Sequence, residues 1–225
     1  MSVWESLVGQ ERVAEVLQQA ASDPRAMTHA WLFTGPPGSG RSVAARAFAA
    51  ALQCEAAEPG CGVCASCRSV MAGAHPDVTT VATEKVVIDI AQVRELVATA
   101  SRSASQGRWR VILVEDADRM AERTSNVLLK SIEEPPERTV WLLCAPSPED
   151  VIVTIRSRCR HVGLRIPAPE AVADLLVRRD GVDPARALEA ARAAQSHVGI
   201  ARRLATRADA RERRRTLLSI PTQIR

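Results

Sequence analysis

The 225-residue chain is predicted to be an α/β protein built on a parallel sheet with helices on both faces. Short apolar runs typical of buried strands alternate with helical patterns. A glycine-rich loop follows the first of these runs and opens a helix. Beyond His161 the strand signals stop, and Ala, Leu and Arg recur at helical spacing. We therefore expect an α/β domain over 1–163 and a small all-α domain over 164–225.

The first predicted strand is the apolar run from Ala30 to Thr34, which stops at a cluster of Gly, Pro and Ser. From Val43 to Leu52, small apolar residues repeat over about three turns and predict a helix. A stretch rich in Cys, Gly and Pro then interrupts the alternation over about 54–77, and we expect it to be an insertion.

The alternation resumes after the insertion. Residues from Ile90 to Ala100 have a helical pattern, with Asp89 as the expected N-cap. The run from Arg110 to Val114 is apolar and β-branched, and is predicted to be a strand. A helix from about Arg123 to Glu134 is ended by two prolines, and the run from Val140 to Cys144 repeats the character of a buried strand.

The C-terminal part begins with a predicted linker from Arg165 to Pro169, and its helical pattern starts at Glu170. An arginine-rich stretch runs from Arg202 to Arg215. Such a stretch is either a solvated helix face or a surface that faces a polyanion.

Composition and charge narrow the class of protein. Hydrophobic residues make up 46% and charged residues 25%, and no apolar run approaches the roughly 18 residues that a membrane span needs. The N-terminus lacks the basic-then-apolar order of a secretory signal, so we expect a cytoplasmic protein. A net charge of +4 is too small to make the whole surface a polyanion binder. Four aromatic side chains lie in apolar runs and are expected in the core: Trp31, Phe33, Phe48 and Trp141.

The glycine-rich loop has the pattern of a phosphate-binding loop, with backbone N–H groups and a helix N-terminus that would point at an anion. A full loop of this type has lysine at position 41, a compact charge that fits between phosphates, whereas the guanidinium found here is wide and planar. Nucleotide binding stays open, but we expect efficient hydrolysis to be lost. The candidate nucleotide-binding residues are Gly35, Gly38, Gly40, Arg41 and Ser42.

Two acidic residues, Glu115 and Asp116, follow the predicted strand 110–114. In a working P-loop enzyme of this kind, an Asp holds Mg²⁺ and a following Glu orients the attacking water. Here the order is reversed, so Glu115 is a methylene too long for the first role and Asp116 a methylene too short for the second. If Asp116 instead holds the metal, Ala117 replaces the base. Either register predicts an impaired site, in agreement with Arg41.

Four cysteines with the spacing Cys-x6-Cys-x2-Cys-x2-Cys predict a metal site: Cys54, Cys61, Cys64 and Cys67. Thiolates at this spacing converge on one tetrahedral ion, for which zinc is the favoured metal. A ferredoxin cluster would need a further cysteine at the position of Met71, and free or disulfide-bonded cysteines are the other alternative. Four protein thiolates leave no open position for a substrate, so the zinc would be structural.

Taken in order, these motifs resemble the clamp-loader branch of the AAA+ ATPases over essentially the whole chain. Two more motifs carry the resemblance. They are the pattern Asn-x-Leu-Leu-Lys-x2-Glu-Glu-Pro-Pro over 126–136 and the triplet Ser157-Arg158-Cys159. The resemblance implies an AAA+ nucleotide-binding domain with a zinc insertion, followed by a small helical lid domain.

The resemblance also implies roles for three further residues. Val8 opens a Val-Gly-Gln segment similar to the one that lies against the nucleotide base. Arg158 looks like the arginine finger, which acts in trans at the ATP site of a neighbouring subunit. Arg202, in Gly-Ile-Ala-Arg, is similar to the lid arginine that senses the γ-phosphate.

Within this branch, two bacterial subunit types carry the zinc insertion: an ATP-hydrolysing motor, called gamma or tau, and a stator. The motor has Lys in the loop, Asp-Glu at the strand end and threonines after the next strand. This chain has Arg41, Glu115-Asp116 and Cys144-Ala145-Pro146 there, and its motifs His75-Pro76-Asp77 and Val93-Arg94-Glu95 look like the stator. The resemblance therefore favours a stator without ATP hydrolysis of its own.

The function implied is that of a subunit of the DNA polymerase III clamp loader, which places the sliding clamp on primed DNA. Its partners would be other subunits, of the gamma/tau and delta types, the sliding clamp and, through the complex, primed DNA. Structural zinc is the expected cofactor, and ATP or ADP with Mg²⁺ stays open. Clamp-loader subunits also have a helical collar domain, and we expect this chain, which ends at Arg225, to lack it.

Two alternatives remain at this point. One is an active ATPase of the gamma/tau type that tolerates Arg41. The other is a zinc-dependent DNA-binding module, against which the small net charge argues.

Overall fold

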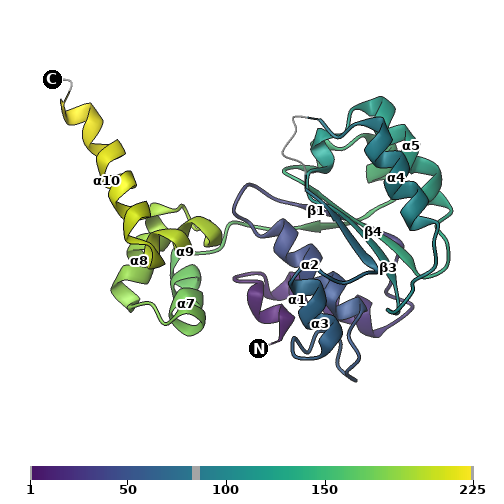
Figure 1. The fold of residues 1–225 in the computed structure, drawn as a ribbon, viewed down its shortest axis with the longest axis horizontal. Coiled ribbons are helices and arrows are strands. Elements are labelled where there is room, and N and C mark those ends of the chain that lie inside the picture. The colour runs from purple at the N-terminus through teal and green to yellow at the C-terminus, as the bar shows by residue number, and fades with distance from the viewer. Residues whose placement is uncertain (1, 83–86, 224–225) are drawn as a thin grey trace. The chain divides into compact units, whose positions relative to one another are not determined.

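The computed structural model of the chain describes residues 2–82 and 87–223. It divides into two compact units, each of which is described by itself: residues 1–36 with 41–165, and residues 37–40 with 166–225. Figure 1 shows the first unit as a sheet covered by helices, and the part of the second unit after residue 166 as a group of helices.

The first unit is built on a sheet of five parallel strands in the order β2-β3-β4-β1-β5. β1 and β3 begin and end at the predicted residues, and β4 extends the predicted run by one residue at each end. The predicted α/β class with a parallel sheet is confirmed. The strands are β1 Ala30–Thr34, β2 Val78–Val81, β3 Arg110–Val114, β4 Thr139–Ala145 and β5 Arg160–Gly163.

The two edge strands, β2 and β5, are not predicted by the pattern of apolar runs. β5 carries the exposed Arg160 and His161 beside the buried Val162, and it continues to Gly163, past the point where the strand signals stop. β2 contains two threonines and no fully buried residue. Each edge strand pairs on one side only, β2 with β3 and β5 with β1. Because an edge strand is partly solvated, it can carry polar residues that hide its strand character.

Helices cover both faces of this sheet (Figure 1). α4 begins with a capping box, in which Asp89 accepts a hydrogen bond from the Gln92 N–H (2.9 Å), so the predicted N-cap is confirmed. α5 ends at Glu133, just before the two prolines, as predicted to within one residue. In the described part of the first unit the helices are α1 Glu11–Ser22, α2 Arg41–Leu52, α3 Ala65–Met71, α4 Ile90–Ala100, α5 Glu122–Glu133 and α6 Val153–Arg156, with 3-10 turns η1 Val3–Ser6, η2 Ala117–Arg119 and η3 Pro148–Asp150.

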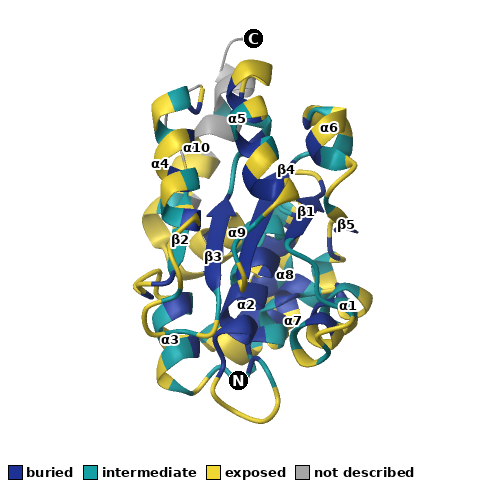
Figure 2. Ribbon diagram, turned by 90° about the vertical axis from the view of Figure 1, so that its right-hand side faces the viewer, coloured by how far each residue is buried: buried dark blue, intermediate teal, exposed yellow. Residues whose placement is uncertain are grey.

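The core has two layers, one on each face of the sheet, because consecutive residues of a strand point to opposite faces. Trp31 of β1 joins the layer under α1, α2 and α3, where its ring meets Phe48 edge-on with centroids 4.9 Å apart. Leu32, the next residue, joins the layer under α4 and α5 with Leu128. Figure 2 shows β1, β3 and β4 in the dark blue of buried residues. The four aromatic side chains expected in the core are all fully buried: Trp31, Phe33, Phe48 and Trp141.

The second unit contains helices α7 Pro169–Asp180, α8 Pro184–Ala193, α9 Val198–Thr206 and α10 Ala208–Gln223. α7 begins next to the predicted helix start at Glu170 and ends at Gly181, whose φ of 64° is the left-handed conformation common at helix ends. α7 and α8 pack together through residues such as Leu176 and Ala187, which are fully buried. Among the described residues, no helix combines the length and the apolar character needed to cross a membrane.

Candidate nucleotide and metal sites

The carboxyl ends of β1, β3 and β4 meet at one edge of the sheet, because parallel strands all point the same way. Gly35 follows β1, and its N–H donates a hydrogen bond to the carbonyl of Pro146, which follows β4 (3.1 Å). Glu115 follows β3 at the same edge. The start of the glycine-rich loop and the acidic pair therefore lie beside the end of β4.

The glycine-rich loop joins β1 to α2, a helix of 12 residues. Gly38 and Gly40 have φ values of 90° and 92°, which residues with a Cβ rarely adopt. The loop follows a path that needs glycine and ends at a helix N-terminus, where N–H groups are free to meet an anion. Ser42 lies half-buried in the first turn of α2.

Arg41 occupies the lysine position of the phosphate-binding pattern. Its guanidinium donates a hydrogen bond to the carbonyl of Gly35, in the same loop. The charge at this position is therefore directed at the backbone of its own loop.

The acidic pair after β3 is accompanied by arginines. Glu115 Oε1 lies 2.7 Å from Nη2 of Arg46, on α2, and the two side chains are 18% and 35% exposed. Asp116 Oδ1 lies 3.8 Å from Nε of Arg119, in the next 3-10 turn. The carboxylate nearer to β3 is thus neutralised from within the chain.

The buried thiol of Cys144 lies close enough to several of these charged side chains to be affected by them. Cys144, near the end of β4, is fully buried, and burial raises the pKa of its thiol above the ordinary range. The charges of Glu115, Arg41, Asp116 and Arg46 also act on this pKa, the acidic ones raising it and the basic ones lowering it. The structure therefore brings three of the predicted site residues, Arg41, Glu115 and Asp116, together around the end of β4.

A cavity of about 470 Å³ lies between the start of α1 and β5. Gly9 and Gln10, the second and third residues of the Val-Gly-Gln segment, line it together with His161 and Arg165, whereas Val8 does not. Gln10 joins the two sides of this cavity, because its Nε2 donates a hydrogen bond to the carbonyl of Arg165, which follows β5 (2.5 Å). The segment similar to a base-binding one thus borders a cavity of its own.

Arg158 lies just after α6, on the surface of the first unit. Its Nη2 is 2.5 Å from Oε1 of Glu133, at the end of α5, and its Nη1 donates to the carbonyl of Thr154 (2.7 Å). The side chains of Arg158 and Glu133 are 39% and 43% exposed. The predicted finger is therefore paired with the first Glu of the Glu-Glu-Pro-Pro motif.

Arg202 belongs to the second unit, on α9. Its Nε donates to Oδ1 of Asp180, at the end of α7, over 3.0 Å. Burial raises the pKa of Asp180, but the neighbouring Arg179 and Arg202 outweigh it and lower the pKa below its ordinary value. Arg202 is thus held by a carboxylate within its own unit.

The four predicted metal ligands converge in the insertion. Their sulfur atoms all lie within 4.8 Å of one another, and Cys54 Sγ and Cys64 Sγ are 4.0 Å apart. In a tetrahedral zinc site with Zn–S bonds of about 2.3 Å, the sulfurs are about 3.8 Å apart. The donor set and its spacing fit zinc, and all six cysteines of the chain are free of disulfides. The residues that would hold the ion are Cys54, Cys61, Cys64 and Cys67.

The local backbone lowers the pKa of one of these thiols and positions two others. The N–H groups of Val63 and Cys64 lower the pKa of Cys61 to about 6, which favours the thiolate that binds metal. The N–H of Cys67 donates to Cys64 Sγ (3.3 Å), and Cys64 is the N-cap of α3. The short helix α3, which the sequence pattern does not predict, thus positions the last two cysteines.

Several structural residues around these sites escape sequence reasoning. The N-terminal turn η1 holds the insertion, since Trp4 Nε1 donates to the carbonyl of Pro59 (3.0 Å). Asp77, fully buried, accepts hydrogen bonds from the backbone N–H groups of three consecutive residues, 105–107, and pairs with Arg110 (2.9 Å). Asp77 lies in the His-Pro-Asp motif, but its partners are about 30 residues away in the chain and have no local sequence signal.

Comparisons with known proteins show what the chain is similar to in sequence. The family model described as "DNA polymerase III, delta subunit" matches residues 9–168. The chain is 39% identical to the DNA polymerase III subunit delta' of Pseudomonas aeruginosa, over 72% of this chain and 50% of that protein. It is 37% identical to the gamma/tau subunit of Mycobacterium bovis, over 76% of this chain and 30% of that protein. The chain spans about half the length of the delta' relative and less of the gamma/tau relative.

Solved structures support the fold alone. A RuvB variant from Thermotoga maritima superposes with a TM-score of 0.64 at 16% identity, over 91% of this chain and 64% of that one. A protein related to the DNA polymerase III gamma subunit, from the same organism, gives a TM-score of 0.52 at 21% identity, over 73% of this chain and 49% of that one.

Proposed function

Because the chain belongs to the DNA polymerase III delta-subunit family, we propose that it is a delta-prime-like stator of the clamp loader. In this role it helps to load the sliding clamp onto primed DNA during replication. The Arg46–Glu115 ion pair carries the proposal, because it neutralises one of the two carboxylates available to a catalytic Mg²⁺. As a replication subunit the chain would act in the cytoplasm.

The stator role follows from what the glycine-rich loop and the acidic pair lack. Efficient hydrolysis needs a charge placed between phosphates, a carboxylate for Mg²⁺ and a residue that orients water. Arg41 is bonded to Gly35, and Glu115 is bonded to Arg46. Both features would have to change before this chain could turn over ATP, so its domain would act as a fixed surface against which ATP-binding neighbours close.

In this role Arg158 acts as the arginine finger of a neighbouring ATP site. An arginine supplied in trans is worth about 10³ to 10⁵ in the rate of phosphoryl transfer. Arg158 must leave Glu133 to reach a phosphate, and an exposed ion pair of this kind contributes only about 0 to 1 kcal/mol. The cost of releasing the finger is therefore small beside the stabilisation that it would supply.

The remaining site residues are assigned by the same proposal. The cavity beside Gly9 and Gln10 would take the base of a bound nucleotide, with Val8 next to its lining in sequence. The helices after residue 166 would form a lid domain, whose Arg202 would sense the γ-phosphate. Gly35, Gly38, Gly40 and Ser42 would contact the phosphates through a degenerate loop.

Zinc would be held by the four cysteines as a structural ion. It would supply a crosslink that fixes the insertion. Trp4 and Gly60 then join the insertion to the N-terminus, because the Trp4 indole contacts the glycine so closely that an added Cβ would lie 2.5 Å from Nε1. The metal would therefore stabilise the insertion and take no part in catalysis.

A gamma/tau-like ATPase is the second candidate, favoured by the 37% identity to the gamma/tau subunit of Mycobacterium bovis. The two candidates differ in one observable property, because only the motor hydrolyses ATP by itself. They share the zinc site, so metal content does not separate them.

Reconstitution tests the stator role. A clamp loader assembled from gamma/tau and delta subunits with this chain, in its full natural length, should load the clamp onto primed DNA, and the same mixture without it should not. Equal loading with and without the chain would contradict the proposal.

A further inference from the structure

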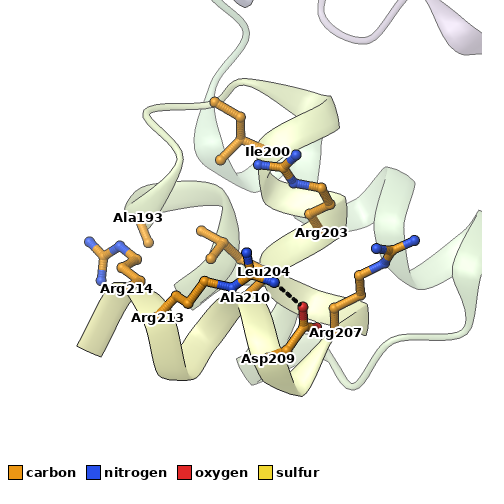
Figure 3. A pocket seen from close by; sticks show the side chains of 9 residues that line it. All are labelled: Ala193, Ile200, Arg203, Leu204, Arg207, Asp209, Ala210, Arg213 and Arg214. Carbon is orange, nitrogen blue, oxygen red and sulfur yellow. Dashed lines mark hydrogen bonds and ion pairs between the residues drawn. The ribbon is translucent and has the colours of Figure 1, made fainter. Parts of the chain in front are cut away.

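A groove with arginines around an apolar floor lies in the second unit, between α9 and the start of α10 (Figure 3). It encloses about 440 Å³. Its apolar part comes from Ile200 and Leu204 of α9 and Ala210 of α10. The nucleotide-site residues, Arg158, Arg202 and the four cysteines do not line it, so the functions assigned above leave it unexplained.

Helical spacing brings the lining residues to one side. On α9, Arg203 and Leu204 follow Ile200 by three and four residues, and Arg207, just after the helix, follows Leu204 by three, which places them on one side. Figure 3 shows the arginines of both helices around this face. The arginines that line the groove are Arg203, Arg207, Arg213 and Arg214.

The groove has an excess of positive charge, with four arginines and one carboxylate among its lining residues. The carboxylate, Asp209, lies 2.7 Å from Arg213, and both side chains are largely exposed. The side chains of Arg203 and Arg214 form no hydrogen bond or ion pair with any residue that the structure describes.

We propose that this groove binds an acidic peptide segment of a partner protein, with one apolar side chain on the floor and carboxylates on the arginines. A guanidinium matches a carboxylate with two parallel hydrogen bonds, and it desolvates more readily than an ammonium. The apolar side chain of the peptide would cover Ile200, which is 41% exposed, and removing this apolar surface from water favours binding. The proposal does not depend on the clamp-loader role.

The apolar floor favours a peptide over a nucleic acid. A phosphodiester backbone would meet the arginines equally well, but it has no apolar group to place against Ile200 and Leu204. The stretch from Arg202 to Arg215 holds seven arginines and two acidic residues and would also attract a polyanion, so the apolar floor alone favours the peptide. Nucleic acid is therefore an outcome that the experiment must separate.

Fluorescence anisotropy with a labelled peptide tests the proposal. The probe carries one Leu between runs of Glu and Asp, and a second probe has Ser in place of this Leu. A variant with both Arg203→Glu and Arg214→Glu should bind the Leu probe about tenfold more weakly, which corresponds to about 1.4 kcal/mol. The double variant with Arg178→Glu and Arg186→Glu is the matched control, because both are exposed arginines outside the groove and the total change of charge is the same.

The Leu probe should also bind at least about fivefold more tightly than the Ser probe, because its side chain buries apolar surface. Circular dichroism melting verifies that each variant is folded, and the double variant with Arg203→Ala and Arg214→Ala replaces the first one if charge reversal unfolds the protein. The proposal is overturned by no binding of the Leu probe, by equal binding of the two probes, by equal effects of the groove and control variants, or by tighter binding of an oligothymidylate.

Discussion

Arg46 on α2 and Glu115 after β3 form an ion pair, with 2.7 Å between Nη2 and Oε1. The pair spans 69 residues of sequence and joins the helix that follows the glycine-rich loop to the acidic end of the neighbouring strand. It gives the chain its own counter-charge at the place where a P-loop enzyme uses a metal ion. Arg46 thus neutralises Glu115 without a metal ion.

Removing this counter-charge should destabilise the protein. Glu115 is only 18% exposed, so Arg46→Ala would leave a poorly solvated carboxylate without its partner. We expect the free energy of unfolding to fall by about 1 kcal/mol, as measured by urea denaturation at neutral pH. Arg46→Lys keeps the charge and should lose less. Equal stability of Arg46→Ala and the unmodified chain would contradict a neutralising role for Arg46.

Asp77 should make stability depend on pH in the acid range. Burial raises its pKa, but hydrogen bonds from the backbone N–H groups of residues 105–107 outweigh this and lower the pKa to about 2. The folded state therefore binds this proton less tightly than the unfolded state does, whose pKa is about 3.9. The stabilisation is complete above about pH 4 and is lost as the pH falls towards 2.

Asp77→Asn isolates this contribution. At pH 7 the variant should lose about 2 kcal/mol of unfolding free energy or more, because it forfeits both the charge and the ion pair with Arg110. The difference between the two proteins should shrink as the pH is lowered from 4 to 2. Denaturant titrations at several pH values measure it, and a difference that stays constant over this range would rule out the titration of Asp77 as its source.

Zinc removal should loosen the insertion from the N-terminus. We expect one zinc per chain by elemental analysis, and a lower melting temperature after chelation, because the binding free energy of a structural ion is folding free energy. Trp4, whose indole donates to Pro59, should also change its fluorescence, and Trp4→Phe should remove most of that change. A metal-free protein with an unaltered melting curve would show that the cysteine cluster needs no ion.

Arg158 should matter only in an assembled complex. Arg158→Ala leaves Glu133 exposed to water, so it should change the stability of this chain by less than about 1 kcal/mol. The ATP turnover of a clamp loader that contains the variant should fall by about tenfold or more. Glu133→Gln is the matched control, since it breaks the same ion pair and leaves the arginine in place. If both variants have the same turnover as the unmodified complex, Arg158 is not a finger.

The sequence predicts the centre of the sheet better than its edges. β1 and β3 are continuous apolar runs because helices bury both of their faces, and such runs are visible in any sequence. β2 and β5 pair on one side only and carry Thr, Arg and His, so their residues do not form a continuous apolar run. The N-cap Asp89 is predictable from the sequence because its hydrogen-bond partner lies only three residues away.

The candidate site divides in the same way. The cysteine cluster follows from spacing, because its ligands lie within one short segment, and their sulfurs do converge. The Arg46–Glu115 pair and the bonds of Asp77 join residues far apart in the chain, so only the fold reveals them. The sequence gives the charges of Arg203 and Arg214, but the groove that they line depends on how α9 and α10 pack against each other.

Steady-state ATP hydrolysis by the isolated chain distinguishes a stator from a motor. The chain would be measured with Mg²⁺, beside Arg41→Lys and beside a gamma/tau subunit as the active control. We expect no turnover by the unmodified chain and none by Arg41→Lys, because Glu115 stays bound to Arg46 and the order of the acidic residues stays reversed. Clear Mg²⁺-dependent turnover by the unmodified chain would contradict a stator role and identify this subunit as a motor.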